Sequence, residues 1–277
     1  MSISISEENN QMPFWRNIKS KGRKNRKGKY GLDIGDRGIY DTRNRLNELT
    51  GKEWIYFTNS IWITAFPPTA GKETGFDIRK IHPSPKPPEL MKDIINFFTK
   101  RYEWVLDPFA GVGGTLIGAS LCAPQRNCVG IDLNYNYKEA YEEVCKNMNI
   151  QKQEYICDDS RNMLDHEIVS ETTFDLIVTD PPYSDMMLRP KNGQKKKLYG
   201  ENSPTPFSLD TRDIGNLAYE DFLNELVSIL SISIERLKEK GYLVIFCRDL
   251  QPTEESPNIL HADIITKLHQ LLGIRYR

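Results

Sequence analysis

The sequence predicts an α/β protein built on a doubly wound, mostly parallel sheet. From residue 89 onward, helix-like apolar patterns alternate with short apolar runs, as in parallel strands joined by crossover helices. Hydrophobic residues make up 39% and charged residues 27% of the 277 residues, which is typical of a folded globular chain. Motifs rich in glycine or proline follow the expected strands, where such sheets bind ligands.

The expected elements follow this alternation. Strands are predicted at Trp104–Leu106, Cys128–Asp132, Tyr155–Cys157, Phe174–Thr179 and Tyr242–Cys247. Helices are predicted at Glu89–Thr99, Thr115–Cys122, Tyr137–Met148, Tyr219–Lys240 and Ala262–Leu271. In a doubly wound sheet the ligand lies beyond the carboxyl ends of the strands, so residues at those ends are the candidates for function.

The chain divides into a basic, irregular N-terminal extension, residues 1–80, and a main domain, residues 81–277, with an insertion at about 184–216. Between Arg16 and Lys29 lie eight basic residues and no acidic one. Such a run is expected either to contact nucleic-acid phosphates or to form a solvated tail.

Composition argues against several classes of protein. No segment approaches the roughly 18 apolar residues of a membrane span, and the N-terminus lacks an export signal, so a cytoplasmic location is expected. The five cysteines are scattered singly, without metal-ligand spacing, which favours reduced core cysteines and no metal site.

The first motif is Asp107-Pro108-Phe109-Ala110-Gly111-Val112-Gly113-Gly114-Thr115, between an expected strand and an expected helix. Its glycines allow a tight turn and a close approach of a ligand to the backbone. A structural turn or a dinucleotide site would look similar. It is no Walker phosphate loop, because no Gly-Lys-Ser/Thr follows.

Acidic residues end the next two strands. Asp132, which precedes Leu133 and lies about 20 residues past the glycines, suits hydrogen bonds from ribose hydroxyls, although a helix cap would also explain it. Asp158 and Asp159 follow the third strand. One of them is expected to accept a hydrogen bond from an adenine amino group, and Asp159 is the better placed.

The fourth strand ends in Asp180-Pro181-Pro182-Tyr183. Two prolines fix the backbone and remove ladder hydrogen bonds, so a rigid exposed corner is expected. Asp180 and the carbonyl of Pro181 can accept hydrogen bonds from one amino group, and Tyr183 can stack on a flipped-out base. A plain proline-rich turn is the alternative.

These motifs resemble those of the S-adenosylmethionine-dependent DNA amino-methyltransferases, which make N6-methyladenine or N4-methylcytosine. Residues 107–113 resemble the family's cofactor motif, and residues 180–183 its catalytic motif. His82-Pro83-Ser84-Pro85-Lys86-Pro87 resembles the family's His-Pro-x-x-Lys-Pro segment, which packs beside the cofactor. The matches span roughly residues 80 to 250.

The resemblance implies a Rossmann-like class I methyltransferase fold, S-adenosylmethionine as cofactor, and duplex DNA with a flipped-out base as substrate. The implied catalytic residues are Asp180, Pro181, Pro182 and Tyr183. The implied cofactor-binding residues are His82, Ser84, Lys86, Pro87, Asp107, Pro108, Phe109, Ala110, Gly111, Gly113, Thr115, Asp132, Leu133, Asp158 and Asp159. Neither a metal nor a covalent intermediate is expected.

Adenine N6 is the expected target, because Asp at the first position of the corner is commoner in the family's adenine enzymes. The alternatives are an N4-cytosine enzyme, an RNA guanosine N2 methyltransferase, which also carries such corners, and a non-catalytic nucleic-acid-binding module. Restriction, phage defence and solitary marking all use this chemistry.

Target recognition is expected from the basic insertion Ser184–Asn216, from the N-terminal part including Asn44–Trp62, or from a partner. The family's fold normally continues past the fifth strand with a helix and an antiparallel strand pair, and this sequence ends where that pair would begin. Either the chain is truncated or a protein partner completes the sheet edge.

Overall fold

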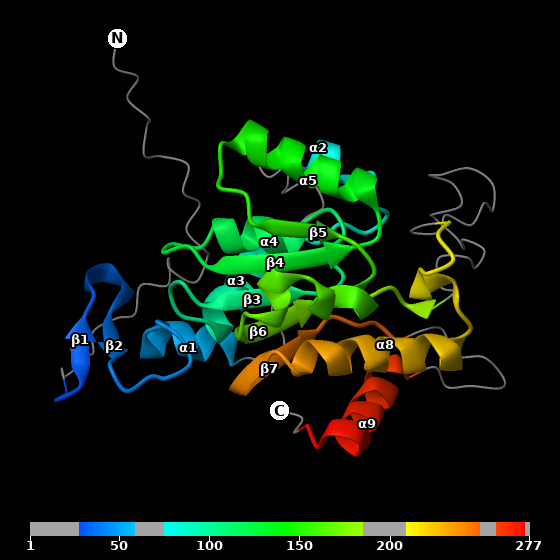
Figure 1. Ribbon diagram of the computed structural model, residues 1–277. Helices are drawn as coiled ribbons and strands as arrows, with labels where there is room; N and C mark the ends of the chain where they lie inside the picture. The colour runs from blue at the N-terminus through cyan, green and yellow to red at the C-terminus, as the bar shows by residue number, and fades with distance from the viewer. Residues whose placement is uncertain (1–27, 59–74, 185–208, 250–258, 275–277) are drawn as a thin grey trace, which may run out of the picture. The chain divides into compact units, whose positions relative to one another are not determined.

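The computed structural model describes residues 28–58, 75–184, 209–249 and 259–274 (Figure 1). The chain forms two compact units, residues 1–65 and 66–277. Most of the basic run, most of the insertion and the end of the segment Asn44–Trp62 lie outside the described residues.

The described part of the first unit contains a small hairpin and a helix. Strands β1 (Gly31–Asp33) and β2 (Ile39–Asp41) pair antiparallel, and helix α1 (Gly51–Phe57) begins with a capping box between Thr50 and Glu53. Arg37 donates to both carboxylate oxygens of Glu53, at 2.9 and 3.0 Å. Regular structure therefore occurs inside the segment that the sequence suggested to be irregular.

The second unit is built on a parallel sheet of five strands (Figure 1). They are β3 (Trp104–Asp107), β4 (Asn127–Asp132), β5 (Glu154–Cys157), β6 (Phe174–Thr179) and β7 (Leu237–Ile245). Their spatial order is β5-β4-β3-β6-β7, and every pair is parallel. The chain moves outward from β3 in one direction and then in the other, so the predicted doubly wound sheet is confirmed.

Helices precede, connect and follow these strands. They are α2 (Phe76–Arg79), α3 (Pro88–Phe98), α4 (Gly114–Ser120), α5 (Tyr135–Met148), α6 (Glu167–Ser170), α8 (Tyr219–Ile234) and α9 (Leu260–Leu272), with the 3₁₀ segments η4 (Ser160–Asp165) and η6 (Ile214–Asn216). Because crossovers are right-handed, α4 and α5 cover one face, while η4, α6 and α8 cover the other. No helix within the described ranges is long and apolar enough to cross a lipid bilayer.

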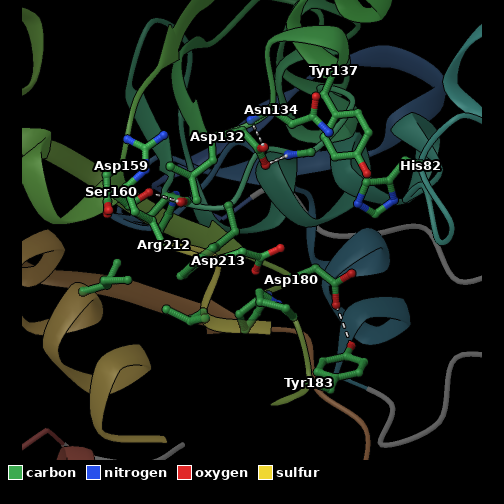
Figure 2. A pocket seen from close by; sticks show the side chains of 18 of the residues that line it. His82, Asp132, Asn134, Tyr137, Asp159, Ser160, Asp180, Tyr183, Arg212 and Asp213 are labelled. Atoms are coloured by element: carbon green, nitrogen blue, oxygen red, sulfur yellow. Dashed lines mark hydrogen bonds between the residues drawn. The ribbon is translucent and has the colours of Figure 1, made fainter. Parts of the chain in front are cut away.

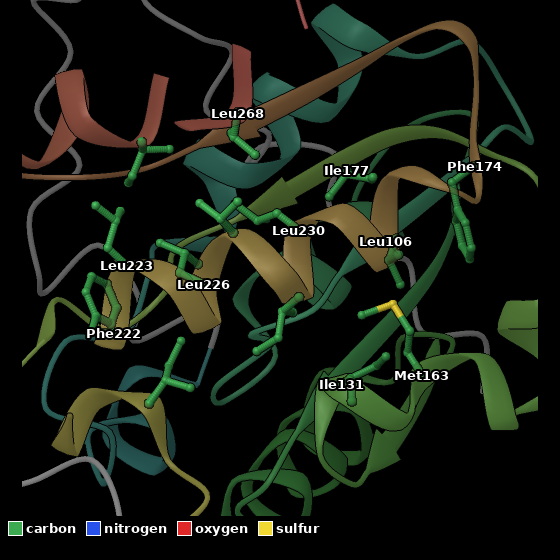
Figure 3. Close-up of a cluster of buried hydrophobic side chains, with 14 of the residues drawn as sticks. Leu106, Ile131, Met163, Phe174, Ile177, Phe222, Leu223, Leu226, Leu230 and Leu268 are labelled. Atoms are coloured by element: carbon green, nitrogen blue, oxygen red, sulfur yellow. The ribbon is translucent and has the colours of Figure 1, made fainter. Parts of the chain in front are cut away.

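The main apolar core lies between the sheet and α8 (Figure 3). Strands β3, β4 and β6 contribute Leu106, Ile131 and Ile177, which are fully buried. Helix α8 contributes Phe222, Leu226 and Leu230 to the same cluster. Burial of such a side chain stabilises the fold by about 1.5–3 kcal/mol, so this core fixes the strand ends that carry the motifs.

Helices α3 and α4 pack closely because Gly118 faces α3. A Cβ atom at this position would lie 2.8 Å from the Cβ of Met91 and 2.9 Å from the amide nitrogen of Lys92. The close packing brings the start of α3, and with it the preceding segment His82–Pro87, to the helix that follows the glycine-rich turn. The segment His82–Pro87 and the glycine-rich turn, which are distant in sequence, therefore lie close together.

The prediction of a helix up to Lys240 was wrong. Helix α8 ends at Ile234, and β7 already begins at Leu237. Leu237 pairs with Phe174 of β6, with a register irregularity before Leu176. Pairing with a neighbouring strand therefore overrides the helix-like charge pattern of this segment, and Lys240 adopts a φ of 67°.

Candidate active site

A cavity opens at the carboxyl ends of β3, β4 and β6 (Figure 2). Here β3 pairs with β4 on one side and with β6 on the other, so the cavity lies where the strand order reverses. The space within its lining is about 820 Å³, which includes solvent at the open mouth.

The structure brings most of the predicted site residues together around this cavity. Its lining includes His82, Ser84, Pro108, Phe109, Gly111, Asp132, Leu133, Asp159, Asp180, Pro181, Pro182 and Tyr183. The remaining predicted residues are absent from the lining: Lys86, Pro87, Asp107, Ala110, Gly113, Thr115 and Asp158. Several of these support the residues that do line it.

Asp107 lies beneath the cavity and fixes the turn above it. It is 3% exposed, and its Oδ1 accepts hydrogen bonds from the Phe109 amide at 3.0 Å and the Thr179 hydroxyl at 2.7 Å. Its Oδ2 accepts from the Thr115 hydroxyl at 2.5 Å. Burial raises the pKa of Asp107 to about 6. The carboxylate thus ties the ends of β3 and β6 to the start of α4.

Two glycines of the turn adopt left-handed backbone angles, with φ of 51° at Gly111 and 73° at Gly113. A Cβ atom at Gly113 would lie 2.4 Å from Cδ2 of Tyr141, so no other residue fits there without displacement. At Gly111 the nearest atom would be Nε2 of His82, at 3.3 Å. Packing requires a glycine at position 113, and Gly111 lines the cavity.

The carboxylate of Asp132 faces the cavity at the end of β4. Its Oδ2 accepts from the Gly111 amide at 2.8 Å, and its Oδ1 accepts from the Asn134 amide at 2.9 Å. Each oxygen keeps a second lone pair for a ligand hydroxyl. Burial raises the pKa of Asp132 to about 6. Hydrogen bonds donated by a ligand would stabilise the ionised carboxylate and therefore lower this pKa.

The structure separates the two acids that follow β5. Asp158 lies outside the cavity lining, with its Oδ2 2.9 Å from Nε2 of His166. Asp159 lines the cavity, is 7% exposed, and is held by Arg161, with Nη2 to Oδ2 at 2.7 Å. Of the two, only Asp159 is therefore placed to meet a ligand.

The proline corner presents Asp180 with two donors. The Tyr183 hydroxyl donates to Oδ1 at 2.6 Å (Figure 2), and the Lys86 ammonium pairs with Oδ2, also at 2.6 Å. Lys86 lies 5.7 Å from the centre of the Phe246 ring, and its carbonyl accepts from the buried guanidinium of Arg79 at 2.9 Å. The upstream motif therefore orients the corner motif directly.

His82 forms the wall opposite this corner. Its ring packs edge-on against Tyr137, with centroids 4.9 Å apart, and its Nδ1 accepts from the Ser84 amide at 3.1 Å. Burial lowers the pKa of His82 to about 4, so the ring is neutral near pH 7. Because Nδ1 is an acceptor, the proton resides on Nε2.

Seven further residues line the cavity that sequence reasoning missed. They are Asn134, Tyr137, Ser160, Arg212, Asp213, Ile214 and Ile229. Three of them, Asn134, Tyr137 and Ser160, follow the predicted acids Asp132 and Asp159 within a few positions, so their proximity to those acids could have indicated them. The other four come from the return of the insertion and from α8, where no motif signals them. No group of three or more His, Cys, Asp or Glu side chains suited to a metal occurs among the residues with described positions.

The cavity fits a nucleoside cofactor with an extended side group. Asp132 offers lone pairs for ribose hydroxyls, while Phe109, Pro182 and Ile214 supply apolar walls suited to the faces of a base. Gly111 of the glycine turn lines the same cavity. The fold is that of a class I methyltransferase, and the cavity at its switch point is the candidate cofactor site.

Within that class the chain resembles the DNA amino-methyltransferase family. A family model described as DNA methylase, of the N6/N4 type, matches residues 8–143. The predicted family is thereby confirmed, and with it S-adenosylmethionine as the cofactor.

Two relatives from Methanothermobacter thermautotrophicus match parts of the chain. A tRNA (guanine(10)-N2)-dimethyltransferase is 33% identical over 122 residues, which cover 43% of this chain and 34% of that protein. The Type II methyltransferase M.MthZI is 45% identical over 56 residues, 20% of this chain and 15% of that protein. The matched parts thus span about a third or less of either relative.

Among solved structures, a SAM-dependent methyltransferase from Agrobacterium tumefaciens aligns at 19% identity and a TM-score of 0.40. The alignment covers 64% of this chain and 48% of that one.

Proposed function

We propose that this protein transfers a methyl group from S-adenosylmethionine to the exocyclic N6 amino group of adenine at specific sites in DNA. The observation that carries the proposal is the geometry of Asp180, which stands in the cavity wall between the Lys86 ammonium and the Tyr183 hydroxyl. Both neighbours donate to it, so the carboxylate is presented as an acceptor, as recognition of an amino group requires.

The cofactor, when bound, supplies a methyl group made electrophilic by a positively charged sulfur. Asp180 and the carbonyl of Pro181 would accept the two amino hydrogens of the base and so aim the nitrogen lone pair at that methyl group. An exocyclic amine is a poor nucleophile because its lone pair is delocalised into the ring, so this orientation supplies most of the acceleration. The surplus proton passes from the nitrogen to the Asp180 carboxylate, and from there to water, only as the new bond forms, so Asp180 is not needed as a base before attack.

The other cavity residues would hold the cofactor. Asp132 would accept from the ribose hydroxyls and Asp159 from the adenine amino group, while the glycine turn lies against the amino-acid part. Asp107 and Thr115 act from below by fixing the turn.

Tyr183 would form the platform for a base that has left the duplex. Its hydroxyl is fixed by Asp180 at 2.6 Å, which restricts the ring to one orientation at the cavity wall. A flipped base stacked on such a ring brings its amino group to the neighbouring carboxylate. Target recognition and phosphate contacts are assigned to residues 1–80 and to the insertion.

Two alternatives have support of their own. N4 of cytosine carries the same kind of amino group, and the matched family model covers both N6 and N4 chemistry. Guanosine N2 in RNA is favoured by the match to a tRNA guanine-N2 dimethyltransferase. The Type II relative, in turn, favours a role in restriction and modification.

Methyl transfer from radiolabelled S-adenosylmethionine tests the proposal. Unmethylated duplex DNA and bulk tRNA are offered separately, and the labelled nucleoside is identified after digestion. Labelled N6-methyladenine from DNA is expected, with a loss of at least about 100-fold in Asp180→Ala. Label in cytosine or in tRNA guanosine would replace the proposal by one of the alternatives. Absence of transfer to either polymer, despite cofactor binding, would contradict it.

A further inference from the structure

The segment that follows the insertion, from Asp213 to Leu217, packs against the proline corner and lines the cavity. Asp213 caps the 3₁₀ segment η6, its Oδ1 accepting from the Gly215 amide at 2.8 Å. Gly215 packs on the catalytic corner, since a Cβ atom there would lie 2.9 Å from the Cβ of Pro182. Ser184, at the start of the insertion, donates to the carbonyl of Leu217 at 3.0 Å. This anchoring fixes Asp213 against the cavity, which it lines.

The acids around the cavity differ in their partners. Asp180 is paired with Lys86 and Asp159 with Arg161. Asp213, by contrast, forms no ion pair with any residue the structure describes, and only its Oδ1 has a hydrogen bond there. It is nevertheless 8% exposed. An uncompensated carboxylate that is mostly removed from water is costly, so it favours a positively charged ligand.

Asp213 lies between the ribose end and the methyl-transfer end of the cavity. In Figure 2 its carboxylate points into the cavity between those of Asp132 and Asp180. Its charge contributes to the raised pKa values of Asp132 and Tyr137, which places it electrostatically close to the β4 side. Its packing through Gly215 on Pro182 places it beside the catalytic corner.

We propose that Asp213 is a charge-selective cofactor-binding residue that favours positively charged S-adenosylmethionine over its neutral product, S-adenosylhomocysteine. This inference rests on the proposed function, because it assumes that the sulfur lies near Asp180. The two molecules share the nucleoside and the amino acid and differ in one methyl group and one positive charge. The attraction of the carboxylate is therefore present before transfer and absent after it.

This arrangement would serve turnover. Transfer of the methyl group leaves its bonding electron pair on sulfur, which becomes a neutral thioether. At that moment Asp213 again has no ion-pair partner among the described residues, so retention of the product is disfavoured. Groups that bind the shared parts of the cofactor, such as Asp132, cannot discriminate in this way.

Binding of the two molecules to the full-length protein tests the inference. Dissociation constants for S-adenosylmethionine and S-adenosylhomocysteine are measured by titration calorimetry on the natural protein and on Asp213→Asn. The asparagine oxygen can still accept from Gly215, so the cap is retained while the charge is lost. Glu235→Gln, which removes a charge from an exposed position after α8, is the control.

In Asp213→Asn we expect S-adenosylmethionine to bind at least about five-fold more weakly, with less than about a two-fold change for S-adenosylhomocysteine. Glu235→Gln should change neither. Equal weakening of both ligands, or of neither, would overturn the inference. Binding of S-adenosylhomocysteine also shows that Asp213→Asn is folded. If Asp213→Asn does not fold, Asp213→Ser, whose hydroxyl can also accept from the Gly215 amide, is measured in its place.

The outcome is distinguishable from that of the proposed function. If the charge-selective loss occurs but neither polymer accepts a methyl group, the role of Asp213 stands and the proposed function fails. If the natural protein binds neither small molecule, both are overturned.

Discussion

Tyr183 and Tyr219 make hydrogen bonds of the same kind in different places. Each hydroxyl donates to a carboxylate at 2.6 Å, Tyr183 to Asp180 at the cavity and Tyr219 to Asp263 between α8 and α9. We expect Tyr183→Phe to lower kcat about ten-fold, because a charge-assisted hydrogen bond that orients the catalytic carboxylate is worth about 1.5–3 kcal/mol. Tyr219→Phe should leave kcat unchanged.

Steady-state kinetics on the proposed DNA substrate, with cofactor affinity measured separately, checks this pair. A kcat that falls equally in both variants would show that the effect is one of stability and not of orientation.

We expect Asp132 to make the cofactor affinity depend on pH. Its pKa is about 6 in the free protein because of burial, and hydrogen bonds from ribose hydroxyls to the ionised form would lower it. The affinity is therefore fully present above pH 6 and is lost as the pH falls through 6 toward the lower pKa of the complex. We expect S-adenosylmethionine to bind about ten-fold more weakly at pH 5 than at pH 7.5.

Titration calorimetry between pH 5 and 8 measures this dependence, and Asp132→Asn should flatten it while weakening affinity at pH 7.5. Asp213, whose pKa burial also raises, would contribute in the same direction. His82 stays neutral over this range, since its pKa is about 4. An unchanged profile in Asp132→Asn would assign the titration to another group.

At the scale of the element, the glycine turn depends on close packing with α5. Gly113 and Gly273 both have left-handed φ angles, 73° and 63°, but only at Gly113 would a Cβ atom meet a neighbour, the ring of Tyr141. Gly273→Ala should cost about 1 kcal/mol from backbone strain alone. Gly113→Ala should cost about 2–4 kcal/mol, because overpacking is added to that strain.

Urea denaturation of the two variants measures the difference in the free energy of unfolding. Equal losses would show that α5 moves away from the turn without cost. In that case cofactor affinity would reveal the displacement, since the turn forms part of the cavity.

Sequence reasoning predicted those elements whose signals are local. The strands before Asp132 and Asp180 are short, apolar and followed by distinctive residues, and the structure places both acids at the cavity. The segment 237–240 was assigned to a helix because pairing with β6 leaves no local signal. Asp213 was missed for the same reason: its position depends on where the insertion returns, which the packing of Gly215 on Pro182 and the hydrogen bond from Ser184 to Leu217 fix.

For the whole molecule, the distribution of charge matters more than the net charge of −1. The cavity wall carries four carboxylates beside the Arg212 guanidinium. Asp180 and Asp159 are paired with cations, whereas Asp132 and Asp213 form no ion pair among the described residues and would repel nucleic-acid phosphates. A polyanionic substrate must therefore be held by cations elsewhere, and the run Arg16–Lys29, with eight basic residues and no acidic one, is the densest group in the sequence. Counterion release from phosphates by such a run adds affinity that falls as salt rises.

We therefore expect the triple substitution of Lys21, Arg23 and Lys24 by Gln to weaken DNA binding at low salt. The slope of log K against log salt concentration should become shallower by about 0.9 for each phosphate that the protein no longer neutralises.

The matched control replaces Lys146, Lys152 and Lys240, which are exposed and lie near the end of α5, before β5 and in the first part of β7. These positions are at the amino ends of the strands, opposite the cavity, so neutralising them removes the same net charge and leaves phosphate binding intact. Fluorescence anisotropy with labelled duplex DNA between about 50 and 200 mM salt measures both slopes. If the slope falls equally in the two triple variants, the effect belongs to net charge and the basic run is a solvated tail; if it falls only in the first, the run binds the phosphates that the acidic cavity cannot.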